Sequence, residues 1–188
     1  MDINYISHIL IIDDNSPADQ INEMIKFLKD FNVNIKIIHR KIRGHYISMN
    51  MIFDEVKTEY IFHLEDDWLL TKEAPLIKIG LDKMRKNEKI KSVLYRRWVS
   101  YKDGVHYWNG KKYNNEDIMT YPGYTFNPTL QNIKAIHQEI GHFKNVPFFE
   151  LAYSYRYAEK FVVGMTEDDY FEHLGHGKSA YEINRSKR

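Results

Sequence analysis

The sequence predicts an α/β fold in which helices flank a mixed, mainly parallel sheet. Apolar segments of strand type alternate with segments of helical spacing over the first 70 residues. Two of these strand segments end abruptly in acids, as strands do where they leave a buried sheet. The chain has 188 residues, 43% of them hydrophobic, which suffices for one well-packed domain.

The first predicted unit is a strand, a helix and a second strand. The apolar run ILII ends at Asp13 and Asp14. The segment NSPADQ that follows is typical of a helix start, with Asn15 or Ser16 as the cap. The next strand is expected at residues 33–38. Strands joined in this way run parallel with a right-handed crossover.

A second helix is predicted at residues 45–57, and it leads into the strand EYIFHL at residues 59–64. Three acids follow directly: Glu65, Asp66 and Asp67. In open α/β sheets, ligands bind outside the carboxyl ends of the strands. We therefore expect the two acidic strand ends to face one crevice. Carboxylates there suit Mg2+ or Mn2+ together with a phosphate-containing ligand.

The remaining chain is predicted to contain further helices and strands around an aromatic excursion at about residues 101–124. Asp103-Gly104 and Asn109-Gly110 are strong hairpin signals within it. We expect a helix over residues 127–143 with Thr129 as its cap. Further helices are expected at residues 74–90 and 147–160, and strands at residues 91–99 and 160–165.

A third acidic pair, Asp168-Asp169, follows Thr166 and precedes apolar residues at helical spacing. Acids in a first helical turn beside a capping threonine stabilise the helix without any further role, so a structural interpretation is favoured here. The segment EHLGHGKS offers His173 and His176 as imidazole ligands for a metal. The sequence does not decide between these two histidines.

Composition excludes several classes of protein. Lys and Arg number 27 against 26 Asp and Glu, so the charge is too balanced for a nucleic-acid binder. There are no cysteines, which excludes thiolate metal sites. No apolar run reaches the ~20 residues of a membrane span, and the start of the chain lacks the pattern of a signal peptide. We expect a soluble, cytosolic protein without a transmembrane segment.

Two long segments, ILIIDDNSP and IRGHYISMNMIFDEVKTEYIFHLEDDW, resemble the nucleotide-binding half of a GT-A glycosyltransferase of the family-2 type. That family has a strand ending in Asp-Asp-Gly/Asn-Ser, a basic residue and Gly, a helix with an Asn, and a strand ending in the DxD signature. Downstream, FNPTLQNIKAIHQEIGHF and PFFELAYSYRYAEKFVV are similar to its acceptor-side segments. The resemblance implies a single GT-A domain over residues 1–188, with a nucleotide-sugar-binding half to about residue 70 and an acceptor-side half from about residue 71.

The resemblance also implies roles on the donor side. Asp13 and Asp14 would contact the base and ribose of a nucleotide sugar, and Arg43 could approach its diphosphate. Asp66 would face the ribose or a metal-bound water. Glu65 matches the first position of the signature, which in the family need not touch the metal.

The resemblance further implies a metal-dependent reaction. Asp67 would ligate Mn2+ or Mg2+ across the diphosphate, and His173 could complete the metal shell. Glu150 corresponds most nearly to the catalytic base, with Asp168 or Asp169 as the alternative. The implied activity is transfer of a sugar, with inversion, from a UDP-, GDP- or dTDP-linked donor to a hydroxyl of a glycan, lipid-linked or protein acceptor.

Two other functions remain open from the sequence. ILIIDDNS followed by a helix also resembles a phosphoacceptor receiver domain, although the Lys-Pro that such a domain carries is missing. A catalytically silent sugar-binding module on a GT-A scaffold is the other alternative. The sequence also lacks the N-terminal strand that normally precedes the DDNS strand in the family, and part of the usual base pocket depends on that strand.

Overall fold

The computed structural model describes residues 3–31, 33–41, 44–95, 100–102, 105–108, 111–113, 118–119 and 124–175. Its helices are α1 (Ala18–Leu28), α2 (His45–Glu55), α3 (Leu76–Lys86), α4 (Ile133–Ile140) and α5 (Phe149–Ala158), and a 3-10 turn, η1, spans Ile3–Tyr5. Its strands are β1 (His8–Asp13), β2 (Asn34–His39), β3 (Ile61–His63), β4 (Trp68–Leu70), β5 (Ile90–Leu94), β6 (Ser100–Lys102), β7 (Val105–Trp108), β8 (Lys111–Tyr113), β9 (Ile118–Met119), β10 (Thr129–Gln131), β11 (Val162–Met165) and β12 (Phe171–His173). The predicted α/β class is confirmed.

The largest sheet has five strands in the order β3-β10-β5-β11-β9. Strands β3 and β5 are both antiparallel to β10, and β11 is parallel to β5, so β3, β5 and β11 point the same way. Strands β1 and β2 are parallel, as predicted, but they form a separate two-stranded sheet. A second pair joins β4 to β12 in antiparallel fashion. The sheet structure is therefore mixed, and antiparallel pairs are common in it.

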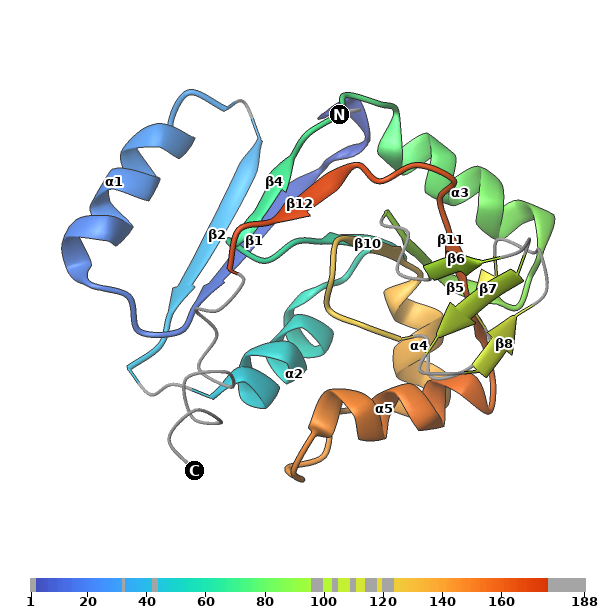
Figure 1. The fold of residues 1–188 in the computed structure, drawn as a ribbon. Coiled ribbons are helices and arrows are strands. Elements are labelled where there is room, and N and C mark those ends of the chain that lie inside the picture. The colour runs from blue at the N-terminus through green and yellow to red at the C-terminus, as the bar shows by residue number, and fades with distance from the viewer. Residues whose placement is uncertain are drawn as a thin grey trace.

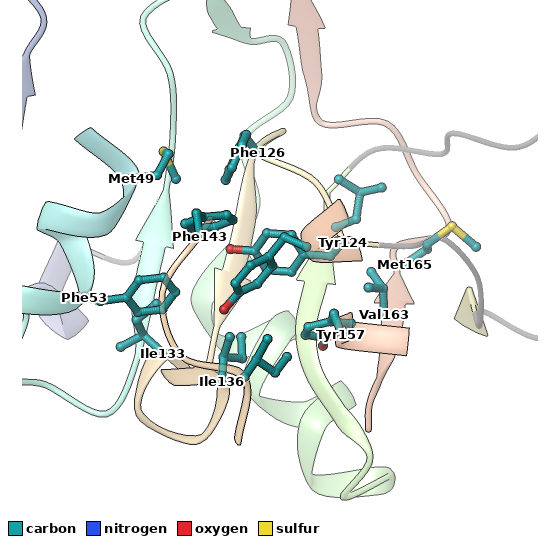
Figure 2. Packing of buried hydrophobic residues seen from close by; sticks show 13 residues of the cluster. Met49, Phe53, Tyr124, Phe126, Ile133, Ile136, Phe143, Tyr157, Val163 and Met165 are labelled. Carbon is teal, nitrogen blue, oxygen red and sulfur yellow. The ribbon is translucent and has the colours of Figure 1, made fainter. Parts of the chain in front are cut away.

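Helices cover both faces of the five-stranded sheet. Val93 and Leu94 are neighbours on β5 and so point to opposite faces. Val93 belongs to a buried cluster with residues of α3, whereas Leu94 belongs to one with residues of α2, α4 and α5. The second cluster is rich in aromatic rings, and Figure 2 shows Tyr124, Phe143 and Tyr157 within it. The core thus lies on the two sides of this sheet.

The unit formed by β1, α1 and β2 is less buried than the rest. Figure 1 shows α1 and β2 at one end of the molecule, with α3 and β6–β8 at the other. No residue of β1 or β2 is fully buried, and α1 has no buried residue. The apolar run ILII of β1 is therefore only partly covered by the described chain.

The helix predicted over residues 127–143 is wrong in its first part. Thr129 does not cap a helix but opens β10, where it pairs with both His63 and Leu94. The helix α4 begins only at Ile133, and its cap is Asn132, whose side chain accepts a hydrogen bond from the backbone N–H of Ala135 at 2.9 Å. Backbone pairing with the two neighbouring strands, β3 and β5, outweighs the helix preference of the local sequence.

The helix start predicted at Asp168-Asp169 is also wrong. The hydroxyl of Thr166 donates to the carbonyl of Asp168 instead of capping a helix, and the backbone N–H of Tyr170 bonds to the carbonyl of Tyr95. The chain bends at residues 167 and 168 and then continues as β12. Asp168 forms an exposed ion pair with Lys72 at 2.7 Å. The two acids therefore lie in a loop and not in a first helical turn.

The aromatic excursion is a three-stranded antiparallel sheet in the order β6-β7-β8. Lys102 pairs with Val105 and Trp108 pairs with Lys111, so antiparallel strands flank both hairpin dipeptides. The dipeptides themselves lie outside the described residues. In the described part of the chain, no helix is both long and apolar enough to cross a bilayer.

Candidate functional site

The end of β1 is tied to the end of β2 through Asp13. The parallel register places Asp13 beside His39, and Nδ1 of His39 lies 2.6 Å from Oδ2 of Asp13. The same carboxylate oxygen accepts a hydrogen bond from the backbone N–H of Ser16 at 3.1 Å. This bond shapes the turn before α1, which begins at Ala18 without a side-chain cap, so the predicted cap at Asn15 or Ser16 is wrong.

Asp14 connects the end of β1 to the N-terminus of α2. Its carboxylate accepts hydrogen bonds from the guanidinium of Arg40 at 2.7 Å and from the backbone N–H of Gly44 at 2.9 Å. The hydroxyl of Ser48 lies within 3.4 Å of the same carboxylate. Arg40 is itself largely buried and also donates to the carbonyl of Gly44. These charge-assisted hydrogen bonds connect the Asp14 carboxylate, the Arg40 guanidinium and the N-terminus of α2 to one another.

The first residue of α2 reaches the second acidic strand end. Nε2 of His45 lies 3.3 Å from Oε1 of Glu65, just after β3. This hydrogen-bonded carboxylate raises the pKa of His45, against the opposing effect of burial. The imidazole also packs against Phe126 and Phe149, with ring centroids 5.0 and 5.3 Å away. The N-terminus of α2 therefore lies between the two acidic segments.

Glu150 lies in the first turn of α5 and faces the same region. Its Oε1 accepts hydrogen bonds from the hydroxyl of Thr125 and the backbone N–H of Phe126, both at 3.0 Å. Burial raises the pKa of Glu150, the two hydrogen bonds oppose this rise, and the charge of Glu65 adds to it. The positive charge of His45 acts in the opposite direction. A partly desolvated carboxylate with a raised pKa is suited to accepting a proton.

Asp67 and His173 are brought together by the pairing of β12 with β4. That pairing places His173 opposite Trp68, and Nε2 of His173 lies 2.9 Å from Oδ2 of Asp67. The backbone N–H of Leu174 donates to the carbonyl of Asp67 at 2.7 Å. A Cβ atom on Gly175 would lie only 2.6 Å from the Asp67 carboxylate, so the backbone passes close over the pair.

The Asp67-His173 pair fits a divalent cation. Oδ1 of Asp67 is buried and accepts no hydrogen bond from the described residues. Leaving a buried carboxylate oxygen unsatisfied is costly, and a cation would remove that cost. No group of three or more His, Asp or Glu side chains within the described ranges is arranged to hold a metal. The rest of a coordination shell would come from water and a phosphate ligand, as is common for Mg2+.

For three other predicted site residues, the structure describes no contact with the rest of the site. Asp66 lies in the turn between β3 and β4 and is exposed. Arg43 and His176 lie outside the described residues, so the choice between His173 and His176 stays a prediction.

Sequence reasoning missed three polar residues of this region: His39, Arg40 and His45. Each gains its place from a partner distant in the chain. His39 depends on Asp13, Arg40 on Asp14, and His45 on Glu65. In the sequence they are marked only by a basic stretch at residues 39–45, within which Arg43 is the residue predicted to approach the diphosphate.

Comparisons with known proteins agree with this fold. Residues 4–154 match the family described as Glycosyl transferase family 2. No curated protein has a sequence that matches this chain. A crystal structure of GalNAc-T7 with UDP, GalNAc and Mn2+ superposes with a TM-score of 0.62 at 12% identity and covers 88% of this chain. The chain of TarS 1-349 from S. aureus, in complex with UDP-GlcNAc, superposes with a TM-score of 0.60 at 12% identity and covers 89%.

The chain is shorter than these structural relatives. It spans 39% of the GalNAc-T7 chain and 51% of the TarS chain in its complex. A second TarS 1-349 structure has a TM-score of 0.62 at 12% identity, covering 95% of this chain and 54% of that one. The family match covers most of the sequence, and it leaves the receiver-domain alternative without support. The chain belongs to glycosyl transferase family 2 and has the GT-A fold of that family.

Proposed function

We propose that this chain transfers a sugar from a nucleoside diphosphate donor to an acceptor hydroxyl, with inversion and with the help of a divalent metal. One observation carries the proposal. The N-terminus of α2 joins Asp14 to Glu65 through Gly44 and His45, and Glu150 faces the same group of charges. In this proposal, the donor-binding residues and the proton acceptor adjoin each other.

The donor would lie along the carboxyl ends of β1, β2 and β3. Asp14 and Arg40 form a hydrogen-bonded polar pair there. The N–H groups at the start of α2 favour binding of an anion. Arg43, two residues on from Lys41, would add positive charge toward the diphosphate, and Asp66 would face the ribose or a metal-bound water. The UDP and UDP-GlcNAc named for two structural relatives favour a uridine donor over a GDP- or dTDP-linked one.

Asp67 and His173 would hold Mn2+ or Mg2+. The Mn2+ named for the GalNAc-T7 structure supports this choice of cation. When bound, such an ion neutralises the charge that develops on a departing diphosphate. The pairing of β12 with β4 keeps the imidazole against the carboxylate, so the chain itself presents both ligands together.

Glu150 would take the proton from the acceptor hydroxyl as that hydroxyl attacks the anomeric carbon. Its Oε1 is held by Thr125 and Phe126, so Oε2 is the oxygen that would receive the proton. Burial of the carboxyl raises its pKa and so increases its basicity. Asp168, the alternative base, is exposed and paired with Lys72. Direct attack from the face opposite the diphosphate inverts the anomeric carbon.

A panel of UDP-, GDP- and dTDP-sugars, assayed with Mn2+ for hydrolysis and transfer, tests the proposal. The wild type should turn over at least one donor, and Glu150→Gln should lower kcat by about 10²- to 10⁴-fold with donor affinity preserved. Glu139→Gln, an exposed glutamate on α4, is the matched control and should retain activity. Donor binding by the wild type without any turnover would instead favour the catalytically silent sugar-binding module.

A further inference from the structure

His39 occupies an exposed position at the carboxyl end of β2, next to the acidic end of β1. The side chain of Asp13 is only 8% exposed, whereas that of His39 is 43% exposed. The backbone N–H of Arg40 also bonds to the carbonyl of Asp13 at 3.0 Å, which fixes the two strand ends to each other. At this end of the two strands, the group exposed to a ligand is therefore the imidazole and not the Asp13 carboxylate.

The contact with Asp13 decides which nitrogen of His39 carries a proton. Burial would raise the pKa of Asp13, but its hydrogen bonds with Ser16 and His39 outweigh burial and hold the pKa below its usual value. An ionised carboxylate can only accept hydrogen bonds. Because Nδ1 of His39 lies 2.6 Å from this carboxylate, Nδ1 must carry the hydrogen. In the neutral imidazole, Nε2 is then a hydrogen-bond acceptor.

We propose that His39 selects the base of the donor nucleotide by accepting a hydrogen bond at Nε2 from a ring N–H of that base. Uracil and thymine offer such an N–H at N3, and guanine offers one at N1. Cytosine and adenine present an unprotonated ring nitrogen at the same edge, so two acceptors would face each other. This inference rests on the proposed function. It would explain why the donor carries a base with a ring N–H.

Asp13 then has a supporting role in place of the direct base contact expected from the sequence. Its carboxylate orients the imidazole and fixes the tautomer, in the same way that carboxylates orient metal-binding histidines. The parallel register between β1 and β2 makes the arrangement possible, because it places Asp13 directly beside His39. Selection of the base would thus depend on a pair of residues from adjacent strands.

Calorimetric titration with UDP, N3-methyl-UDP and CDP in the presence of Mn2+ tests the inference. The wild type should bind UDP at least about fivefold more tightly than either analogue, because the analogues cannot donate to Nε2. In His39→Ala this preference should disappear. In His39→Gln it should be partly restored, since the side-chain carbonyl can accept the same hydrogen bond. His8→Ala, an exposed histidine at the other end of β1, is the matched control and should retain the wild-type preference.

Equal wild-type affinity for UDP and N3-methyl-UDP would overturn the role of His39 while leaving the proposed function standing. The same holds if His39→Ala keeps the wild-type ratio of affinities for UDP and CDP. A variant that lost affinity for all three ligands by one common factor would also contradict selective contact with the base. Failure of the wild type to bind any of the three nucleotides would overturn the proposed function itself, and the inference with it.

Discussion

Glu150 is the residue at which burial and charge act most directly on the proposed chemistry. Desolvation and the negative charge of Glu65 raise its pKa, and two hydrogen bonds and the charge of His45 limit the rise. A base must be deprotonated to act, so activity is lost as the pH falls through this raised pKa. The acidic limb of the activity profile should therefore lie above the ~4.3 of an ordinary glutamate.

The pH dependence of kcat/KM with a saturable acceptor measures that limb. We expect a rise with pH whose midpoint lies above the ordinary glutamate range in the wild type, and no such rise in the residual activity of Glu150→Gln. A midpoint at the ordinary value, or a limb that persists unchanged in Glu150→Gln, would show that another group accepts the proton.

Single residues were predictable from the sequence where a local pattern marked them. Residues 13–14 and 65–67 are acids that directly follow apolar strand segments, and Glu150 stands in an amphipathic first turn. His39 and His45 carry no such mark, because each owes its position to a carboxylate at least 20 residues away along the chain. Only the parallel register of β1 and β2, and the approach of α2 to β3, bring those partners together.

At the scale of elements, α3 meets the sheet through a glycine. A Cβ atom on Gly80 would collide with the hydroxyl of Tyr95 and would lie 2.6 Å from Cδ2 of Leu130. Tyr95 is fully buried and donates its hydroxyl hydrogen to the carbonyl of Leu76, so it has little freedom to move. The close approach of α3 to β5 and β10 therefore requires a residue without a side chain at position 80.

Gly80→Ala tests this packing against helix propensity. In an exposed helix the change would stabilise by about 1 kcal/mol, but inserting a methyl group into a packed core destabilises by about 1–3 kcal/mol. We expect a net loss in the free energy of unfolding, measured by urea denaturation. Arg85→Ala, on the exposed side of α3, should stay within about 0.5 kcal/mol of the wild type. A stabilised Gly80→Ala protein would contradict the described contact.

The unit of β1, α1 and β2 should open more readily than the five-stranded sheet. It has no fully buried residue, whereas Val93 and Leu94 on β5 are completely buried. Regions with little burial open locally at a lower free energy. Native-state hydrogen exchange should therefore show lower protection for the amides of β1 and β2 than for those of β5. Equal protection in both sheets would mean that the chain opens as one unit.

Element types were predictable where periodicity was long, as in α1, α3 and α5, and less so where short strands form. Thr129 follows Pro128 and precedes a helical pattern, yet it belongs to a strand because β3 and β5 leave a place between them. The acids at 168 and 169 precede β12 because Tyr170 bonds to Tyr95, 75 residues earlier. Neither pairing is visible in local sequence.

At the scale of the whole molecule, the predicted single sheet is divided. The strand that ends at Asp13 lies in one sheet, and the strand preceding Glu65 lies in another. Contacts through the N-terminus of α2 connect them. The sequence predicts donor binding before about residue 70 and the acceptor side after it. His173 would be an exception to this division, because it lies in the second half of the chain but contacts Asp67 in the first half.

The proposed function requires that the chain binds a nucleoside diphosphate through a metal held by Asp67 and His173. Calorimetric titration of UDP, with Mn2+ and with EDTA, tests it most directly in the wild type, Asp67→Ala and the exposed control Asp82→Ala. We predict that Mn2+ strengthens UDP binding in the wild type and in the control. In Asp67→Ala this Mn2+-dependent gain should fall by at least about tenfold. Equal Mn2+-dependent affinity in Asp67→Ala and the wild type would contradict the claim.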